Sequence, residues 1–172
     1  MKHELYKKFY ERNMNFLNSR SVAKKVLPFL DKLLTGAFFV GYTILLGYAI
    51  TVKKVSAVDT LPLFFAPIFG LLVVSVLQLA IDRPRPYSEQ GANIAPLEKK
   101  DKQGHSFPSR HLACAAVIAT TCLPYLMPLG IFLYFLTILL SYTRYSLGLH
   151  YPTDLIAGNL VGILCGLTVF LV

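Results

Sequence analysis

The chain has 172 residues, of which 55% are hydrophobic and 15% are charged, and its formal net charge is +8. Its apolar runs are longer than the core of an ordinary soluble domain requires, and its length fits a single domain. The composition therefore excludes a soluble globular protein and predicts an all-α, polytopic bundle of transmembrane helices. The basic residues cluster beside apolar segments and form no nucleic-acid-binding motif, so we expect a membrane surface and not a nucleic acid as the partner.

Residues 1–32 form a basic N-terminal segment that precedes a membrane-embedded domain at 33–172. We expect no secretory signal here, since the segment is dense in charge and no small-residue cleavage site follows an apolar core. The composition suits an amphipathic helix on anionic lipids and suits a solvated basic tail equally well, so both interpretations stay open. The apolar residues are Leu5, Phe9, Met14, Phe16 and Leu17, and the basic ones are Lys7, Lys8, Arg12, Arg20, Lys24 and Lys25.

Five apolar stretches approach the roughly 20 residues that a membrane-spanning helix needs, although the third and fourth are short. They are Leu33 to Val52, Leu61 to Ile81, His111 to Leu126, Leu129 to Tyr142, and Leu155 to Val172. Pro124 and Pro128 predict a hairpin between the third and the fourth. Small residues in the third stretch and at every fourth position of the fifth predict close packing of these two helices. The small residues are Ala113, Ala115, Ala116 and Ala119, and Gly158, Gly162 and Gly166.

Ionisable residues stand at the ends of these stretches. Arg85 follows the second stretch, His111 opens the third, and Arg144 and His150 lie between the fourth and fifth. Because successive spans alternate in direction, all four residues are expected on one side of the membrane. Such groups near hydrocarbon are costly and usually functional. Arginine offers a planar fork of donors that matches phosphate oxygens, which makes Arg85 and Arg144 candidate phosphate ligands, although lone arginines at span ends also snorkel to the interface.

Two histidines add possible chemistry to this anion site. In Pro108-Ser109-Arg110-His111, Ser109 is expected to cap a helix whose first turn binds an anion, and His111 can protonate a leaving oxygen. Further on, Pro152 suits the start of the last helix, so that Asp154 can reach back to His150 and leave its other ring nitrogen free to attack phosphorus. Taken alone, such a His-Asp pair is more often a helix cap beside a surface histidine.

Together the three segments resemble the signature motifs of the type 2 phosphatidic acid phosphatase family, which is related to vanadium haloperoxidases. The family pattern is Lys-x6-Arg-Pro, then Pro-Ser-Gly-His, then Ser-Arg-x5-His-x3-Asp. The matching segments here are Gln78 to Arg85-Pro86, Pro108-Ser109-Arg110-His111, and Thr143-Arg144 through His150 to Asp154. The resemblance implies a membrane lipid phosphatase that works without a metal or other cofactor.

The same resemblance implies a role for each matching residue. His150 would be a phosphohistidine nucleophile oriented by Asp154, and His111 would be the general acid. Arg85, Ser109 and Arg144 would bind phosphate.

This chain departs from the family pattern at the phosphate site. Gln78 replaces the lysine and removes a positive charge, which Arg83 can supply from another direction. Arg110 replaces a glycine and either compensates for Gln78 or obstructs the site. Thr143 keeps the hydroxyl of the usual serine. We therefore include Gln78, Arg83 and Arg110 among the candidate substrate-binding residues.

Several questions stay open at this point. Phosphatidic acid, phosphatidylglycerol phosphate and an isoprenoid diphosphate all fit the implied activity. A non-catalytic protein that binds or translocates lipid phosphates is the alternative, whereas haloperoxidases are large and soluble. Only Lys53 and Lys54 lie on the side opposite the site, so the positive-inside rule favours a cytoplasmic site, while bacterial members of the family generally face outward. Cys114, Cys122 and Cys165 lack metal-ligand spacing and are assigned to packing.

Overall fold

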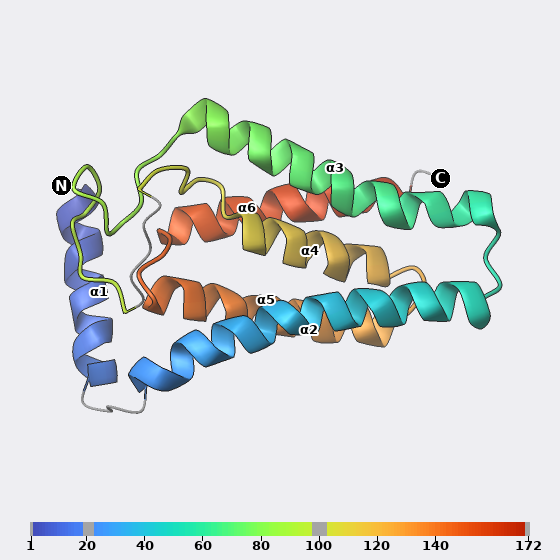
Figure 1. The fold of residues 1–172 in the computed structure, drawn as a ribbon, viewed down its shortest axis with the longest axis horizontal. Coiled ribbons are helices and arrows are strands. Elements are labelled where there is room, and N and C mark those ends of the chain that lie inside the picture. The colour runs from blue at the N-terminus through green and yellow to red at the C-terminus, as the bar shows by residue number, and fades with distance from the viewer. Residues whose placement is uncertain (1, 19–22, 98–102, 171–172) are drawn as a thin grey trace.

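The computed structural model describes residues 2–18, 23–97 and 103–170, and these residues fold as helices and loops without a strand. The helices are α1 Lys2–Asn18, α2 Ala23–Thr51, α3 Ala57–Ile81, α4 Arg110–Cys122, α5 Met127–Ser146 and α6 Pro152–Gly166, followed by a short 3-10 helix, η1, at Leu167–Phe170. Helices α2 to α6 run along the long axis of a bundle, and α1 lies across one end of it (Figure 1). The predicted all-α bundle is confirmed.

Four helices are long and apolar enough to cross a membrane: Lys24–Thr51, Val58–Ile81, Met127–Ser146 and Pro152–Phe170. Large apolar side chains on their outer faces are exposed, as expected of surfaces that contact lipid. Examples are Phe39, Phe65, Leu79, Ile138 and Leu164. The chain is therefore an integral membrane protein. The first span begins at Lys24 and not at Leu33, so the last part of the predicted N-terminal segment belongs to α2.

The third predicted span is α4, which is too short to cross a bilayer by itself. Its 13 residues rise about 20 Å, against a hydrocarbon thickness of about 30 Å. The helix tolerates this length because it lies inside the bundle, packed against α3, α5 and α6 and buried along nearly its whole length. The predicted hairpin after α4 is confirmed, with Pro124 in the turn and Pro128 in the first turn of α5.

Helices α4 and α6 pack closely through small residues, as the sequence predicts. A methyl group added at Gly162 would collide with the carbonyl oxygen of Ala113 and with the side chain of Ala116. One added at Gly158 would collide with the carbonyl oxygen of Ser109. Without a hydrophobic driving force between helices in lipid, such close approach supplies the dispersion contacts that hold the pair together.

The N-terminal segment forms a helix through Asn18, and this helix packs on the protein and is not a solvated tail. Its buried face consists of Tyr6, Tyr10 and Leu17. Leu5, Phe9 and Phe16, three of the apolar residues of the expected amphipathic segment, are exposed. Helix α1 therefore has an inner aromatic face against the bundle and a separate outer apolar stripe.

The α4–α6 contact predicts a selective effect of glycine substitution. Gly162→Ala should destabilise the detergent-solubilised protein by roughly 1–3 kcal/mol, because the backbone carbonyl that it meets cannot move aside cheaply. Gly47→Ala in α2 is the matched control, since its added methyl group meets no atom within 4 Å. Thermal unfolding measures both variants. Equal melting temperatures for the two would contradict the close packing described here.

Candidate active site

The three polar segments meet at the end of the bundle that α1 covers. The segment after α3 and the segment before α4 lie side by side, joined by hydrogen bonds from the Arg85 amide to the Gln103 carbonyl, 2.9 Å, and from the Ser106 amide to the Arg83 carbonyl, 2.9 Å. The Ser109 amide donates to the Asp154 carbonyl at 2.9 Å. These bonds place the first and second motifs against the start of α6, and so beside the third.

His150 lies in the loop between α5 and α6, which the rest of the protein holds firmly. Leu149 donates its amide to the Arg144 carbonyl at 3.2 Å, and Gly148 adopts a left-handed conformation with φ 75° that suits glycine. From α1, Asn13 donates to the hydroxyl of Ser146 at 3.2 Å. His150 itself is only 2% exposed. Its ring is therefore fixed before any substrate arrives.

The nearest partner of the His150 ring is the main chain and not Asp154. Nδ1 lies 2.9 Å from the Ser106 carbonyl oxygen, and 3.7 Å from the nearer carboxylate oxygen of Asp154. A carbonyl can only accept, so Nδ1 carries the proton and Nε2 keeps its lone pair. The sequence reasoning missed Ser106, because its contribution to the ring is a backbone carbonyl that any residue could supply. Asp154, which was expected to bond the ring directly, lies close to Nδ1 but farther away than this carbonyl.

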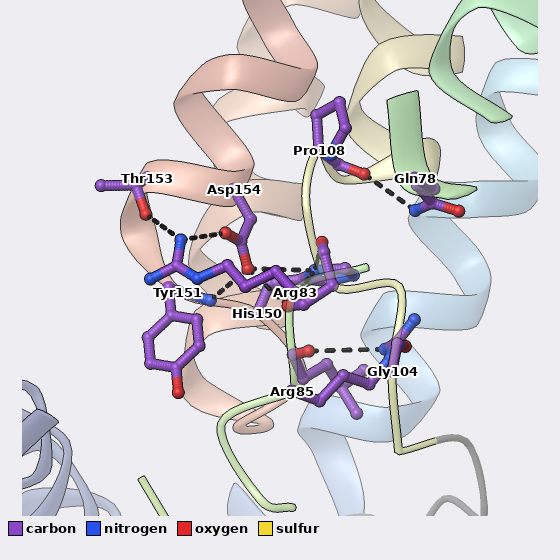
Figure 2. Close-up of polar contacts among 11 residues, drawn as sticks. Gln78, Arg83, Arg85, Gly104, Pro108, His150, Tyr151, Thr153 and Asp154 are labelled. Carbon is purple, nitrogen blue, oxygen red and sulfur yellow. Dashed lines mark hydrogen bonds and ion pairs between the residues drawn. The ribbon is translucent and has the colours of Figure 1, made fainter. Parts of the chain in front are cut away.

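Asp154 is completely buried and accepts hydrogen bonds from several directions (Figure 2). The hydroxyl of Ser106 donates to it at 2.5 Å, the Tyr151 amide at 3.0 Å, and the guanidinium of Arg83 at 2.6 Å. Arg83 also donates to Thr153 at 2.8 Å and stacks over the Tyr151 ring at 4.1 Å. Arg83 thus contacts Asp154 and stabilises its carboxylate. The sequence had instead suggested Arg83 as a substitute phosphate ligand.

Burial lowers the pKa of His150, the charge of Asp154 opposes this effect, and the positive charges of Arg85 and Arg144 lower the pKa further. The ring is therefore neutral at neutral pH. A neutral, buried imidazole with a fixed tautomer is suited to nucleophilic attack.

The remaining charged residues converge around His111. Arg144, His150, Arg85 and Arg110 all interact electrostatically with its ring. Arg85 is oriented by its donors to the carbonyl oxygens of Gly104, 3.2 Å, and of Leu149, 3.4 Å. These residues are far apart in sequence and lie at one end of the bundle. Such a ring of guanidinium groups is suited to bind a phosphate.

Ser109 occupies the predicted N-cap position of α4 but does not cap the helix with its side chain. Its hydroxyl is buried, and among the described residues it has no hydrogen-bond partner. Its own amide donates to the Asp154 carbonyl. A buried hydroxyl without a partner costs stability, which a phosphate oxygen would recover by accepting its proton.

Two of the departures from the family pattern, Gln78 and Arg110, contact each other. Arg110 donates from its terminal nitrogen to the Gln78 side-chain oxygen at 2.8 Å, and the Gln78 amide nitrogen donates to the Pro108 carbonyl at 2.8 Å. Gln78 is 3% exposed. Gln78 therefore holds Arg110 in place. The positive charge of Arg110 comes from α4, whereas the lysine of the family pattern would supply it from α3. This contact favours compensation over obstruction.

A model of the PAP2 superfamily matches residues 59–172. The chain belongs to the PAP2 superfamily. This PAP2 protein resembles the crystal structure of Aquifex aeolicus LpxE with 25% identity and a TM-score of 0.70, over 94% of each chain. It shares the fold of the transmembrane PAP2-type phosphatidylglycerolphosphate phosphatase from Bacillus subtilis, with 24% identity and a TM-score of 0.60, over 98% of this chain and 94% of that one. None of the curated proteins matches it significantly. Family and fold support a lipid phosphate phosphatase.

The contact between Gln78 and Arg110 predicts the outcome of restoring the lysine of the PAP2 pattern. Gln78→Lys should lower phosphatase activity by roughly tenfold, because it removes the acceptor that holds Arg110 and sets a like charge beside it. Gln90→Lys, the same charge change on an exposed loop residue, is the control and should have little effect. Steady-state rates of phosphate release by both variants test this prediction. A faster Gln78→Lys enzyme would mean that lost charge limits the wild type.

Proposed function

We propose that this protein removes the terminal phosphate from a membrane lipid through a phosphohistidine intermediate on His150. The observation that carries the proposal is the buried, neutral imidazole whose Nδ1 is bonded to the Ser106 carbonyl, which leaves Nε2 as the nucleophile. The reaction requires no metal or other cofactor in this scheme.

In the first step, Nε2 of His150 attacks phosphorus and the bond from phosphorus to the lipid oxygen breaks. The ring of His111 must be protonated for this step, and the negative charge of the bound phosphate offsets the surrounding arginines that disfavour that form; the ring then gives its proton to the lipid oxygen as the lipid leaves. The positive charge that develops on the His150 ring is stabilised by Asp154, 3.7 Å from Nδ1. In the second step, water attacks the phosphohistidine while His111 takes a proton from it, and orthophosphate departs.

Arg85, Arg144 and the hydroxyl of Ser109 bind the phosphate oxygens and stabilise the charge of the transition state. Arg110, held by Gln78, supplies the charge that the family lysine would bring. Arg83 acts indirectly, because it keeps Asp154 ionised and in place. In this scheme the four arginines and the two histidines have separate roles at one site.

The substrate class follows from the membrane setting. A lipid phosphate presents its terminal phosphate at the membrane surface, where the site lies, and keeps its tail among the apolar helices. Phosphatidic acid, phosphatidylglycerol phosphate and isoprenoid diphosphates share this form. An LpxE-like fold and the fold of a phosphatidylglycerolphosphate phosphatase support a lipid over a soluble substrate.

Loss of either histidine tests the mechanism. His150→Ala should reduce phosphate release by at least about 10³-fold, and His111→Ala by roughly 10²- to 10⁴-fold, since they remove the nucleophile and the general acid. The assay is phosphate release by the detergent-purified protein from a panel of lipid phosphates, with vanadate inhibition. His3→Ala, in α1 and outside the motifs, is the control histidine.

A radiolabelled terminal phosphate should appear on wild-type protein as an acid-labile adduct, and not on His150→Ala. Near-normal activity of either catalytic variant would exclude the mechanism. Tight vanadate binding without phosphate release from any lipid would favour the non-catalytic alternative.

We also infer that α1 lies among anionic lipid headgroups. Its outer stripe exposes Leu5, Phe9 and Phe16, and Lys7 and Lys8 are exposed on the same helix. An amphipathic helix that carries an apolar stripe and lysines binds the interface by partial insertion and by attraction to anionic lipid, worth about 1 kcal/mol per lysine.

The chain contains no tryptophan, so Phe9→Trp gives a single fluorescent reporter on this stripe. In reconstituted vesicles we expect brominated phosphatidylglycerol to quench it more than brominated phosphatidylcholine does. Lys7→Gln with Lys8→Gln should remove that preference. The matched pair Lys53→Gln with Lys54→Gln, just after the far end of α2, should leave the preference for brominated phosphatidylglycerol intact. Equal quenching by the two lipids in the parent protein would contradict the inference.

A further inference from the structure

Asp31 is a buried carboxylate inside a membrane-spanning helix. It lies in α2, within the apolar span Lys24–Thr51, and is 6% exposed. An ionised group in such a place is costly and persists where it has a charged partner and a function. None of the sequence motifs contains this residue, and it precedes the part of the chain, 59–172, that matches the PAP2 superfamily.

The partner of Asp31 is a residue of the third motif. Its carboxylate oxygen lies 2.8 Å from Nε of Arg144, and the side chains of Asp31 and Arg144 are only 8% and 9% exposed. The hydroxyl of Thr143 approaches the same oxygen at 3.3 Å. Both residues of the Thr143-Arg144 pair, in the last turn of α5, are thus tied to α2.

We propose that Asp31 is a positioning residue for phosphoryl transfer, which acts by orienting the guanidinium group of Arg144. The ion pair, 2.8 Å long, fixes where the guanidinium lies, and its position decides how the other nitrogens meet phosphate oxygens. The carboxylate also balances the arginine's charge before a substrate arrives, which an apolar bundle requires. The role rests on the proposed function, in which Arg144 binds phosphate.

This inference gives α2 a part in the site. Helix α2 packs along α5, where Gly41 lies against Leu133, so the two helices keep a fixed separation that brings Asp31 to Arg144. A chain reduced to the PAP2-matching residues would keep Arg144 and lose the group that orients it. The functional unit therefore begins before residue 59.

A double-variant cycle tests the proposal, with Asp31→Asn, Arg144→Gln and the two combined. Asp31→Asn keeps the size of the side chain and removes its charge, and should lower kcat and raise the vanadate concentration for half-inhibition about tenfold each. In the Arg144→Gln background the same change should have no further effect on either quantity. Asp59→Asn, an exposed carboxylate at the start of α3, is the control and should leave both unchanged.

Thermal unfolding gives a readout independent of turnover. Each single variant leaves one buried charge without its partner, so the double variant should melt above Arg144→Gln. A kcat within twofold of wild type in Asp31→Asn would overturn the proposal. An equal fractional loss in both backgrounds would also overturn it, since Asp31 would then act independently of Arg144.

Wild-type activity in Arg144→Gln would overturn the proposal as well, because Asp31 would then have no phosphate-binding arginine to position. Failure of the proposed function looks different: wild-type protein then binds vanadate but releases no phosphate. In that case the increase in melting temperature that vanadate causes still reports on the coupling between the two residues.

Discussion

The site depends on the burial of one carboxylate, that of Asp154, at the start of α6. This group is inaccessible to solvent, and a buried charge is tolerable only when donors surround it. Its donors come from three places: Arg83 after α3, Ser106 before α4, and the amide of Tyr151 beside His150. Because the loss of any of these donors would leave a buried charge without a partner, the carboxylate holds the three motif segments of the PAP2 pattern together.

Close packing of α4 and α6 makes this network possible. Glycine at 158 lets the backbone of Ser109 approach α6 closely enough for its amide to reach the Asp154 carbonyl. The same approach carries His111, the second residue of α4, toward His150. Small residues in the bundle thus set the distances between the groups that we propose to be catalytic.

Each arginine of the site has a fixed partner before substrate binds. Arg83 is held by Asp154, Arg85 by the Gly104 and Leu149 carbonyls, Arg110 by Gln78, and Arg144 by Asp31. Preorganised cations stabilise a developing charge better than mobile ones, because little reorganisation is needed during the reaction. The partners differ in kind, and three of them, Asp31 and the carbonyls of Gly104 and Leu149, stand outside the residues that the motif pattern specifies.

The membrane class, the helical fold and the residues of the three motifs could be read from the sequence, as could the side of the bundle where the motifs meet. The reason is that span length, hydropathy and the alternation of spans are local properties of the chain. Which side chains contact one another became known only from the folded structure. In the structure Arg83 contacts Asp154, although the sequence suggested that it binds phosphate, and the Ser106 carbonyl lies nearer to His150 than Asp154 does. Gln78 contacts Arg110, and Asp31 contacts Arg144. These contacts link residues separated by up to 113 positions and depend on helix rotation and loop path, which no local pattern encodes.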